Sequence, residues 1–366
     1  MRRLTEEERN MGALARNILY AQLPSRALLV LIQLGVPDML SQQPLSLDIL
    51  AERTNSDRSS LGRLLRSLTV YGVLKEDTQQ VFSLGPVGEA MTTTHPASAL
   101  PSARLLAGAF GDAWLDLLST VRTGQSPFVR NGEIDLFTYM DHDHELRATF
   151  DESQGCGLAL ELDEILDNVD FSEYPLIVDV GGGGGTFLRS ILAATPGVTG
   201  IVFDLPTSIA QQPATTHFKE LSSRYCAVAG NFFESVPSGG DLYILSHILH
   251  DWDDLHAVRI LRTCRRAMGR DSTLMIVDLA GLETGHFDER LHNAAIMDLY
   301  MLSLFGGSGG QERSVNQVKA LLHTAGFHLT DATILPSGMS VIQASPAKKQ
   351  QNESFSSGLV VEIEDD

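Results

Sequence analysis

One stretch constrains the fold of this chain more than any other: a run of five glycines, Gly181–Gly185, that follows the apolar segment Leu176–Val180. The apolar segment is short and rich in β-branched residues, which is typical of a buried parallel strand. Beyond the glycines, apolar residues recur at helical spacing: Phe187, Leu188, Ile191 and Leu192. The stretch therefore predicts a strand, a glycine turn and a helix, an arrangement in which backbone can approach a nucleotide-like ligand.

The spacing of the glycines narrows the choice of ligand. A dinucleotide-binding turn has the pattern Gly-x-Gly-x-x-Gly, and counted from Gly181 its third glycine would fall on Thr186. Gly181, Gly183 and Gly185, preceded by Asp179, resemble instead the Asp-x-Gly-x-Gly-x-Gly motif of methyltransferases that use S-adenosyl-L-methionine (SAM). A flexible loop or another nucleotide site is the alternative explanation of these glycines.

The composition excludes several classes of partner. The chain has 366 residues, a hydrophobic content of 43% and a net charge of −19. This negative charge disfavours nucleic acid and acidic membrane surfaces as partners. No run approaches the roughly 18 apolar residues of a membrane span, and the N-terminus lacks the apolar core of a secretory signal. Three cysteines at unrelated spacings, Cys156, Cys226 and Cys264, indicate neither disulfides nor a metal site, so we expect a cytoplasmic protein.

The first 105 residues predict a helical domain built around a winged helix. Residues 1–24 have the apolar stripe of an amphipathic helix. From Ser25 to about Met91 the sequence indicates three helices and then two strands around a polar turn, which together make a winged helix. Apolar stripes at Met11–Leu19 and Leu28–Ile32 exceed what one small domain can bury, so we expect a homodimer with an apolar interface.

DNA binding is the alternative use of a winged helix. The third helix carries Arg58, Arg63 and Arg66. Residues 46–91 as a whole, however, contain five basic and six acidic side chains, whereas a module that reads DNA has a basic face. The charge balance therefore disfavours a winged-helix regulator and predicts that no nucleic acid is bound.

The remainder of the chain divides into three regions. Residues 106–165 predict a helical connector that lines an acceptor cleft. Residues 166–345 alternate apolar strand candidates with helical stretches, which predicts an α/β, Rossmann-like, doubly wound sheet. The strand candidates are residues 176–180, 200–205, 225–230, 242–249, 273–280 and 339–345. The tail, residues 346–366, is polar and ends acidic, so we expect it to be disordered.

Polar residues at the carboxyl ends of these strands predict a ligand crevice, because such ends share one edge of a parallel sheet. Asp204 ends the second strand, 19 residues after Gly185, where a carboxylate can accept hydrogen bonds from both hydroxyls of a ribose. Asn231 and Phe232 follow the third strand and can contact an adenine ring. His250 closes the fourth strand, and an imidazole there can act as a general base near neutral pH.

Five segments occur in order along the chain: DVGGGGG, VFDLP, GNFF, LHDW and GGQER. Together they resemble the caffeic-acid-type class I O-methyltransferases of plants, fungi and bacteria, and the resemblance runs from Ser25 to about residue 343. It implies SAM as the methyl donor, with S-adenosyl-L-homocysteine as the product, and a hydroxylated small molecule as the acceptor. It also implies a Rossmann-like methyltransferase domain preceded by a mainly helical winged-helix domain that serves dimerisation, and no metal.

The resemblance implies a role for each matched residue. His250 matches the catalytic base, Asp278 an acidic residue 28 positions after it, and Glu312 a second acidic residue that helps to orient it. The cofactor-binding residues that the resemblance and the strand ends together indicate are Asp179, Gly181, Gly183, Gly185, Asp204, Asn231, Phe232 and Ser246. No residue is assigned to a metal.

Three positions depart from the family pattern. Asn231 stands where the family usually has Asp, although an amide can still bond to an adenine ring. Ser246 stands where plant members carry Lys and bacterial members often carry Ser. Gln154 lies near the position at which many members place a Met against the acceptor ring, which implies a more polar pocket.

The sequence thus predicts a SAM-dependent O-methyltransferase that moves a methyl group to a hydroxyl of a small aromatic secondary metabolite. The alternative keeps the fold and changes the reaction to a pericyclic, hydroxylating or decarboxylating step. Members that abandon methyl transfer often lose the catalytic histidine, and here His250 is present. The acceptor itself is not predicted, nor is O-methylation distinguished from N- or S-methylation.

Overall fold

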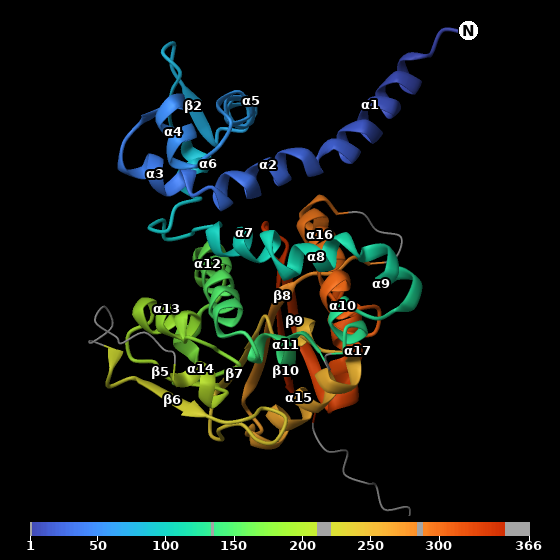
Figure 1. Ribbon diagram of the computed structural model, residues 1–366. Helices are drawn as coiled ribbons and strands as arrows, with labels where there is room; N and C mark the ends of the chain where they lie inside the picture. Colours follow the sequence, from blue (N-terminus) through green and yellow to red (C-terminus); the bar gives the residue numbers. More distant parts are fainter. Residues whose placement is uncertain (1, 133–134, 211–220, 284–287, 348–366) are drawn as a thin grey trace, which may run out of the picture.

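The structure is a computed structural model that describes residues 2–132, 135–210, 221–283 and 288–347. An N-terminal helical part, a set of connecting helices and a seven-stranded sheet follow one another along the chain (Figure 1). The predicted tail, residues 346–366, lies outside the described residues except for its first two.

The N-terminal part contains the predicted winged helix. Its elements are α1 (Glu6–Tyr20), α2 (Gln22–Gln33), α3 (Val36–Gln42), β1 (Leu45–Ser46), α4 (Leu47–Arg53), α5 (Arg58–Thr69), β2 (Leu74–Glu76), β3 (Val81–Leu84) and α6 (Pro86–Glu89). Side-chain oxygens of Ser46 and Asp57 accept backbone N–H bonds and begin α4 and α5. The strands pair antiparallel in the order β1-β3-β2, and the buried core includes Leu31, Leu65 and Phe82.

Helix α1 is largely exposed. The sequence predicts one helix over residues 1–24, whereas the structure has α1 and α2, separated at Ala21. None of the residues of α1 is buried, and its apolar stripe is exposed at Met11, Leu14, Ile18 and Leu19. Figure 1 shows α1 extending away from the rest of the molecule.

Neither α1 nor any other single helix in the described part of the chain is long and apolar enough to cross a membrane. One bent pair of helical segments, Glu6–Gln33 with Val36–Gln42, meets the criteria of length and composition jointly.

A group of mostly short helices connects the N-terminal part to the sheet. They are α7 (Leu100–Ala107), α8 (Ala109–Leu115), α9 (Leu117–Thr123), α10 (Pro127–Arg130), α11 (Leu136–Asp141), α12 (His144–Asn168) and the 3-10 turn η1 (Phe171–Glu173). Phe110, Phe128 and Met140 from these helices form a buried cluster with Leu304, which lies on the later helix α16. This packing fixes the connecting helices against the second half of the chain.

The remaining elements form the sheet and its covering helices. They are β4 (Leu176–Val180), α13 (Thr186–Ala194), β5 (Thr199–Asp204), α14 (Pro206–Ala210), β6 (Tyr225–Ala229), β7 (Leu242–Ser246), η3 (Leu249–Asp251), α15 (Asp254–Ala267), β8 (Thr273–Leu279), η4 (Glu289–Leu291), α16 (His292–Phe305), α17 (Val315–Ala325), β9 (Phe327–Ile334) and β10 (Met339–Pro346). The strand order is β6-β5-β4-β7-β8-β10-β9, with β10 antiparallel to both of its neighbours. The α/β doubly wound fold predicted from the sequence is therefore present.

The sheet reverses its winding between β4 and β7. Strand β4 pairs in parallel with β5 on one side and with β7 on the other, and such a switch point opens a crevice at the carboxyl ends of the strands. Helices α15 and α17 pack on one face of the sheet through Leu261 and Leu322, and α12 and α13 pack on the other through Ile165 and Leu188. The switch point places the glycine turn and the segment that follows β7 side by side.

Two strand predictions were wrong. The expected strand 242–249 ends at Ser246, because His247 adopts a left-handed backbone with φ 53° and Leu249–Asp251 then forms a 3-10 turn. Strand β9 was not predicted, and its residues after Phe327 are mostly exposed, so the segment lacks the continuous apolar run of the inner strands.

Candidate functional site

The glycine turn leaves no room for side chains where it faces its neighbours. Gly181, Gly183 and Gly185 have φ values of 78°, 53° and 73°, which favour glycine. A Cβ atom at Gly181 would overlap Ile248, and one at Gly185 would overlap the Tyr225 hydroxyl. The turn therefore packs closely against its neighbours at the beginning of α13, and the N–H groups of Gly181 and Gly185 donate to the carbonyls of Phe203 and Gly182.

Two carboxylates flank this turn. Asp204, at the end of β5, accepts a hydrogen bond from the backbone N–H of Gly183 at 2.8 Å. Asp179, in β4, is only 1% exposed, and its Oδ2 has no hydrogen-bond partner among the described residues. Burial raises the pKa of Asp179 to about 7, and the charge of Asp204 adds to that rise.

The other predicted cofactor residues surround the same turn. Phe232 lies beside Gly181, since its ring would be 3.6 Å from a Cβ atom there, and it packs edge-to-face against Trp252. Asn231 uses its side-chain oxygen to accept the backbone N–H of Phe233 at 2.9 Å. The hydroxyl of Ser246, at the end of β7, is buried and has no partner within the described part of the chain. The structure thus brings the predicted cofactor residues to one edge of the sheet.

His250 is held by a carboxylate. It lies in η3, is 8% exposed, and its Nδ1 is 3.1 Å from Oε1 of Glu312, itself 5% exposed. A carboxylate only accepts hydrogen bonds, so the ring proton sits on Nδ1 and leaves Nε2 as the acceptor atom. Nε2 has no hydrogen-bond partner among the described residues. Glu312 is fixed in turn by its backbone N–H, which donates to Asp298 at 2.9 Å.

Two further carboxylates approach His250 without bonding to it. Asp278, in β8, is 6% exposed, and its Oδ1 has no partner in the described ranges. Asp251 has its Oδ1 3.6 Å from Nε2 of His250. Burial raises the pKa of each carboxyl group to about 6. Of the two acids predicted from the sequence to serve the base, Glu312 is hydrogen-bonded to it and Asp278 is not.

These carboxylates also act on the imidazole. Burial lowers the pKa of His250, but the charges of Glu312 and Asp251 and the hydrogen bond from the ring to Glu312 outweigh it. The pKa of His250 therefore lies well above its ordinary value. A base with this pKa is active only where the pH is high enough to leave Nε2 unprotonated.

Sequence reasoning missed two residues of this cluster. His247 has its Nε2 2.8 Å from Oε2 of Glu161, on α12, and its ring centre lies 5.4 Å from that of His250. Asp251 belongs to the LHDW segment and could have been noticed there. The contact between His247 and Glu161 joins residues 86 positions apart in the sequence, so no local sequence pattern indicates it.

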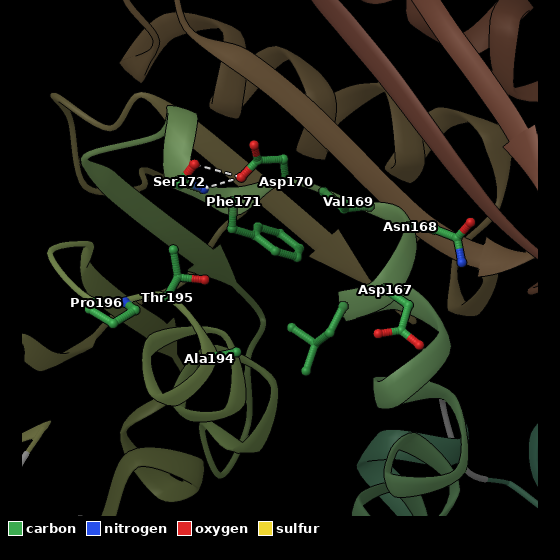
Figure 2. A pocket seen from close by; sticks show the side chains of 10 residues that line it. Asp167, Asn168, Val169, Asp170, Phe171, Ser172, Ala194, Thr195 and Pro196 are labelled. Carbon is green, nitrogen blue, oxygen red and sulfur yellow. Dashed lines mark hydrogen bonds between the residues drawn. The ribbon is translucent and has the colours of Figure 1, made fainter.

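A separate depression lies away from these residues. It is lined by the end of α12, by η1 and by the segment after α13, including Asp167, Phe171 and Thr195 (Figure 2). These segments lead into the amino ends of β4 and β5, so the depression lies at the edge of the sheet opposite the glycine turn. It contains none of the predicted site residues.

Comparisons with known proteins bear on this arrangement. Two family models match: an O-methyltransferase dimerisation domain at residues 17–94 and an O-methyltransferase domain at residues 114–328. The chain is 62% identical over 329 residues to O-methyltransferase SfmM3 of Streptomyces lavendulae, which covers 90% of this chain and 98% of that protein. It is 34% identical over 324 residues to the phenazine O-methyltransferase PhzM of Lysobacter antibioticus, covering 88% and 92%. One similar solved structure is that of CalO1, a methyltransferase in calicheamicin biosynthesis, in its S-adenosylhomocysteine-bound form. The match has a TM-score of 0.77 and 27% sequence identity, and it covers 94% of this chain and 100% of that one.

Proposed function

The chain belongs to the O-methyltransferase family and is a SAM-dependent O-methyltransferase, and on that premise we propose that it methylates a hydroxyl of a small aromatic secondary metabolite with His250 as the general base. The family resemblance expected from the sequence is thereby confirmed. The observation that carries the proposal is the buried Nε2 of His250, which has no hydrogen-bond partner among the described residues while Glu312 holds Nδ1 at 3.1 Å.

The residues around the glycine turn fit SAM. Asp204 offers a carboxylate to the ribose hydroxyls, and the space beside Gly183 is open, with nothing within 4 Å of an added Cβ atom. The buried Ser246 hydroxyl, with no partner among the described residues, supplies a further polar contact. Phe232 and Asn231 would hold the adenine ring. When bound, SAM supplies a methyl group activated by a neighbouring sulfonium charge.

The chain's own residues handle the proton of the acceptor. His250 accepts the hydroxyl proton on Nε2 as the acceptor oxygen forms its bond to the methyl carbon. Glu312 keeps the ring in place and stabilises the resulting imidazolium through the Nδ1 hydrogen bond. Asp278 adds to this stabilisation by its charge alone, because it is not hydrogen-bonded to the ring. General-base catalysis of this kind contributes roughly 10²- to 10⁴-fold.

A group of aromatic side chains around Trp252, two residues after the base, supports an aromatic acceptor. Phe137, on α11, stacks on Trp252 with ring centres 5.7 Å apart and planes 19° apart, and Phe305 lies 5.9 Å from Phe137. Flat apolar surfaces of this kind suit an aromatic ligand. PhzM, the relative from Lysobacter antibioticus, is named for an aromatic acceptor, a phenazine.

The dimerisation-domain match supports a homodimer. The exposed apolar stripe of α1, at Met11, Leu14, Ile18 and Leu19, is a surface that a second copy would cover. Sedimentation at micromolar concentration should give about twice the chain mass of 39.8 kDa. A monomer at that concentration would contradict the assignment of this stripe to the dimer interface.

Transfer of labelled methyl tests the proposed reaction. The purified chain is incubated with methyl-labelled SAM and a panel of phenols, and label is expected on an oxygen of the product. His250→Ala should bind SAM normally and lose at least about 10²-fold in kcat. His328→Ala is the control, since His328 is exposed on β9.

The non-methylating alternative gives a different result. It predicts that an acceptor is converted without label and with little dependence on His250. Retention of most methyl transfer in His250→Ala would instead leave the reaction in place and remove His250 from it.

A further inference from the structure

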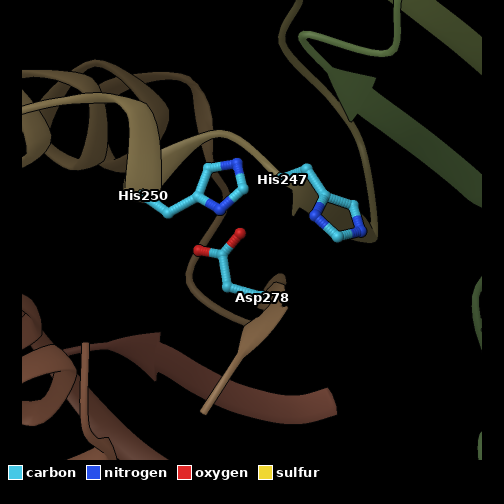
Figure 3. A group of neighbouring side chains, drawn as sticks. All are labelled: His247, His250 and Asp278. Atoms are coloured by element: carbon cyan, nitrogen blue, oxygen red, sulfur yellow. The ribbon is translucent and has the colours of Figure 1, made fainter. Parts of the chain in front are cut away.

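Three side chains near the general base lie close together. His247, His250 and Asp278 each place one ring nitrogen or carboxylate oxygen within 4.8 Å of the others. Figure 3 shows the carboxyl group of Asp278 directed towards the His250 ring, with the His247 ring to one side. Two imidazoles and one carboxylate form a donor set that suits borderline divalent metals such as Zn²⁺.

Each imidazole of this group is braced by a carboxylate on its other side. Nε2 of His247 is 2.8 Å from Glu161, and Nδ1 of His250 is 3.1 Å from Glu312. Metal-binding histidines generally carry such a carboxylate on the nitrogen that does not bind the metal, because it fixes the tautomer and strengthens the ligand. The bracing leaves Nδ1 of His247 and Nε2 of His250 as the available donors.

Buried donor atoms without partners point to a ligand in this group. His250 Nε2 and Asp278 Oδ1 are both buried and have no partner in the described part of the chain. Asp251 faces the same nitrogen at 3.6 Å and can serve as a fourth donor. A divalent cation placed among these donors would supply the partner that His250 Nε2 and Asp278 Oδ1 lack.

His247 is the member of the group that the methyl-transfer mechanism does not use. It adopts a left-handed backbone with φ 53°, which is uncommon for a residue with a bulky side chain. Its backbone N–H donates to the Val277 carbonyl at 2.9 Å, which ties this residue to β8. The left-handed backbone and this hydrogen bond together place the His247 ring next to that of His250, and Glu161 contacts Nε2 of His247.

We propose that His247, His250 and Asp278 form a site for a borderline divalent cation such as Zn²⁺, and that a bound cation prevents His250 from acting as the general base. A tetrahedral ion with bonds of about 2.1 Å needs donors about 3.4 Å apart, so small side-chain rotations complete the site. The metal would occupy Nε2 of His250, the atom that accepts the acceptor proton. The metal is an inhibitor here and not a cofactor, and the inhibitory part rests on the proposed function.

Metal binding is tested first, without any acceptor. The full-length chain, freed of metal by a chelator and carrying no histidine tag, is titrated with Co²⁺ and then with Zn²⁺. One equivalent of Co²⁺ should give the visible absorption of a four-coordinate site, and Zn²⁺ should displace it. His247→Phe should weaken binding at least tenfold. His256→Phe is the matched control, because His256 also pairs with a carboxylate, Asp253 at 2.9 Å, but on the exposed start of α15.

Inhibition is tested second. Zn²⁺ should reduce methyl transfer competitively with the acceptor and leave the SAM dissociation constant unchanged, and His247→Phe should need at least ten times more Zn²⁺ for the same inhibition. Absence of stoichiometric Co²⁺ and Zn²⁺ binding, or equal binding by His247→Phe, would overturn the site. Binding without inhibition would overturn the link to the base. If the wild-type chain transfers no methyl group, the proposed function fails while the metal titration still decides the site.

Discussion

The site at the carboxyl edge of the sheet has two halves, one formed mainly by backbone and the other by side chains. Beside β4 and β5 the site consists mainly of backbone, with left-handed glycines at 181, 183 and 185. Beside β7 and β8 it consists of buried charged side chains, with His250 hydrogen-bonded to Glu312 and Asp278 within 4.8 Å of His250. The backbone half should therefore be sensitive to an added side chain, and the side-chain half to a removed one.

The difference follows from what each half must do. The glycine turn itself contributes backbone and no titratable group, although Asp179 in the adjoining strand β4 is buried and has its pKa raised to about 7. The side-chain half must change its protonation state during the reaction, so it has to bury titratable groups. Its cost is visible in the carboxyl groups of Asp251 and Asp278, whose pKa burial raises to about 6.

The largest effect expected on SAM binding concerns Asp204, the carboxylate at the end of β5 in the backbone half. Asp204→Ala removes a carboxylate that would bind the ribose and that also accepts the Gly183 N–H at 2.8 Å. A hydrogen bond to a charged group contributes about 1.5–3 kcal/mol, so SAM should bind about 10- to 150-fold more weakly. Calorimetry measures the change, and Asp204→Asn, which keeps an acceptor for Gly183, should lose less. Unchanged affinity in Asp204→Ala would show that backbone alone binds the nucleoside.

The next effect tests the backbone half by addition. Gly181→Ala places a Cβ atom against Ile248 at a φ of 78°, and left-handed strain alone costs about 1–3 kcal/mol. Gly197→Ala separates the two causes, because Gly197 has a φ of 91° and nothing within 4 Å of an added Cβ atom. Thermal unfolding with and without SAM should show a larger loss, and weaker ligand stabilisation, for Gly181→Ala. Equal losses in the two variants would attribute the whole effect to φ.

The same contrast explains how much of the site could be predicted from the sequence. The glycine turn is a local pattern of about a dozen residues, and the strands beside it are continuous apolar runs, so both were predictable. His247 escaped notice, because its significance comes from Glu161, which joins it across 86 positions. Glu312 was identified only through the family resemblance. Strand β9 was missed because an exposed edge strand lacks the apolar run on which the prediction relied.

A smaller effect tests the charge behind the base. Glu312→Gln keeps an oxygen for Nδ1 of His250 and removes the negative charge that raises the pKa of that imidazole. In the wild type, kcat should fall as the pH drops and His250 becomes protonated, with the midpoint above the ordinary histidine value of about 6.5. The variant should move this midpoint to lower pH and reduce kcat at high pH by about tenfold, because the imidazolium is less stabilised. A pH profile of kcat under saturating substrates measures both changes, and an unmoved midpoint would exclude Glu312 as its cause.

The smallest effect is expected for a substitution of Asp278. It compares a carboxylate that only lies near His250, Asp278, with one that is hydrogen-bonded to it, Glu312. Asp278→Asn keeps the shape of the side chain and removes a carboxylate that makes no hydrogen bond to His250. Its charge also raises the pKa of His250, but less than the charge and hydrogen bond of Glu312 do. The midpoint of the pH profile should therefore move in the same direction as in Glu312→Gln and by a smaller amount, with kcat at high pH reduced less than about threefold. If Asp278→Asn were the more damaging of the two, Asp278 would have to approach the ring during catalysis, and the side-chain half of the site would rearrange when its ligands bind.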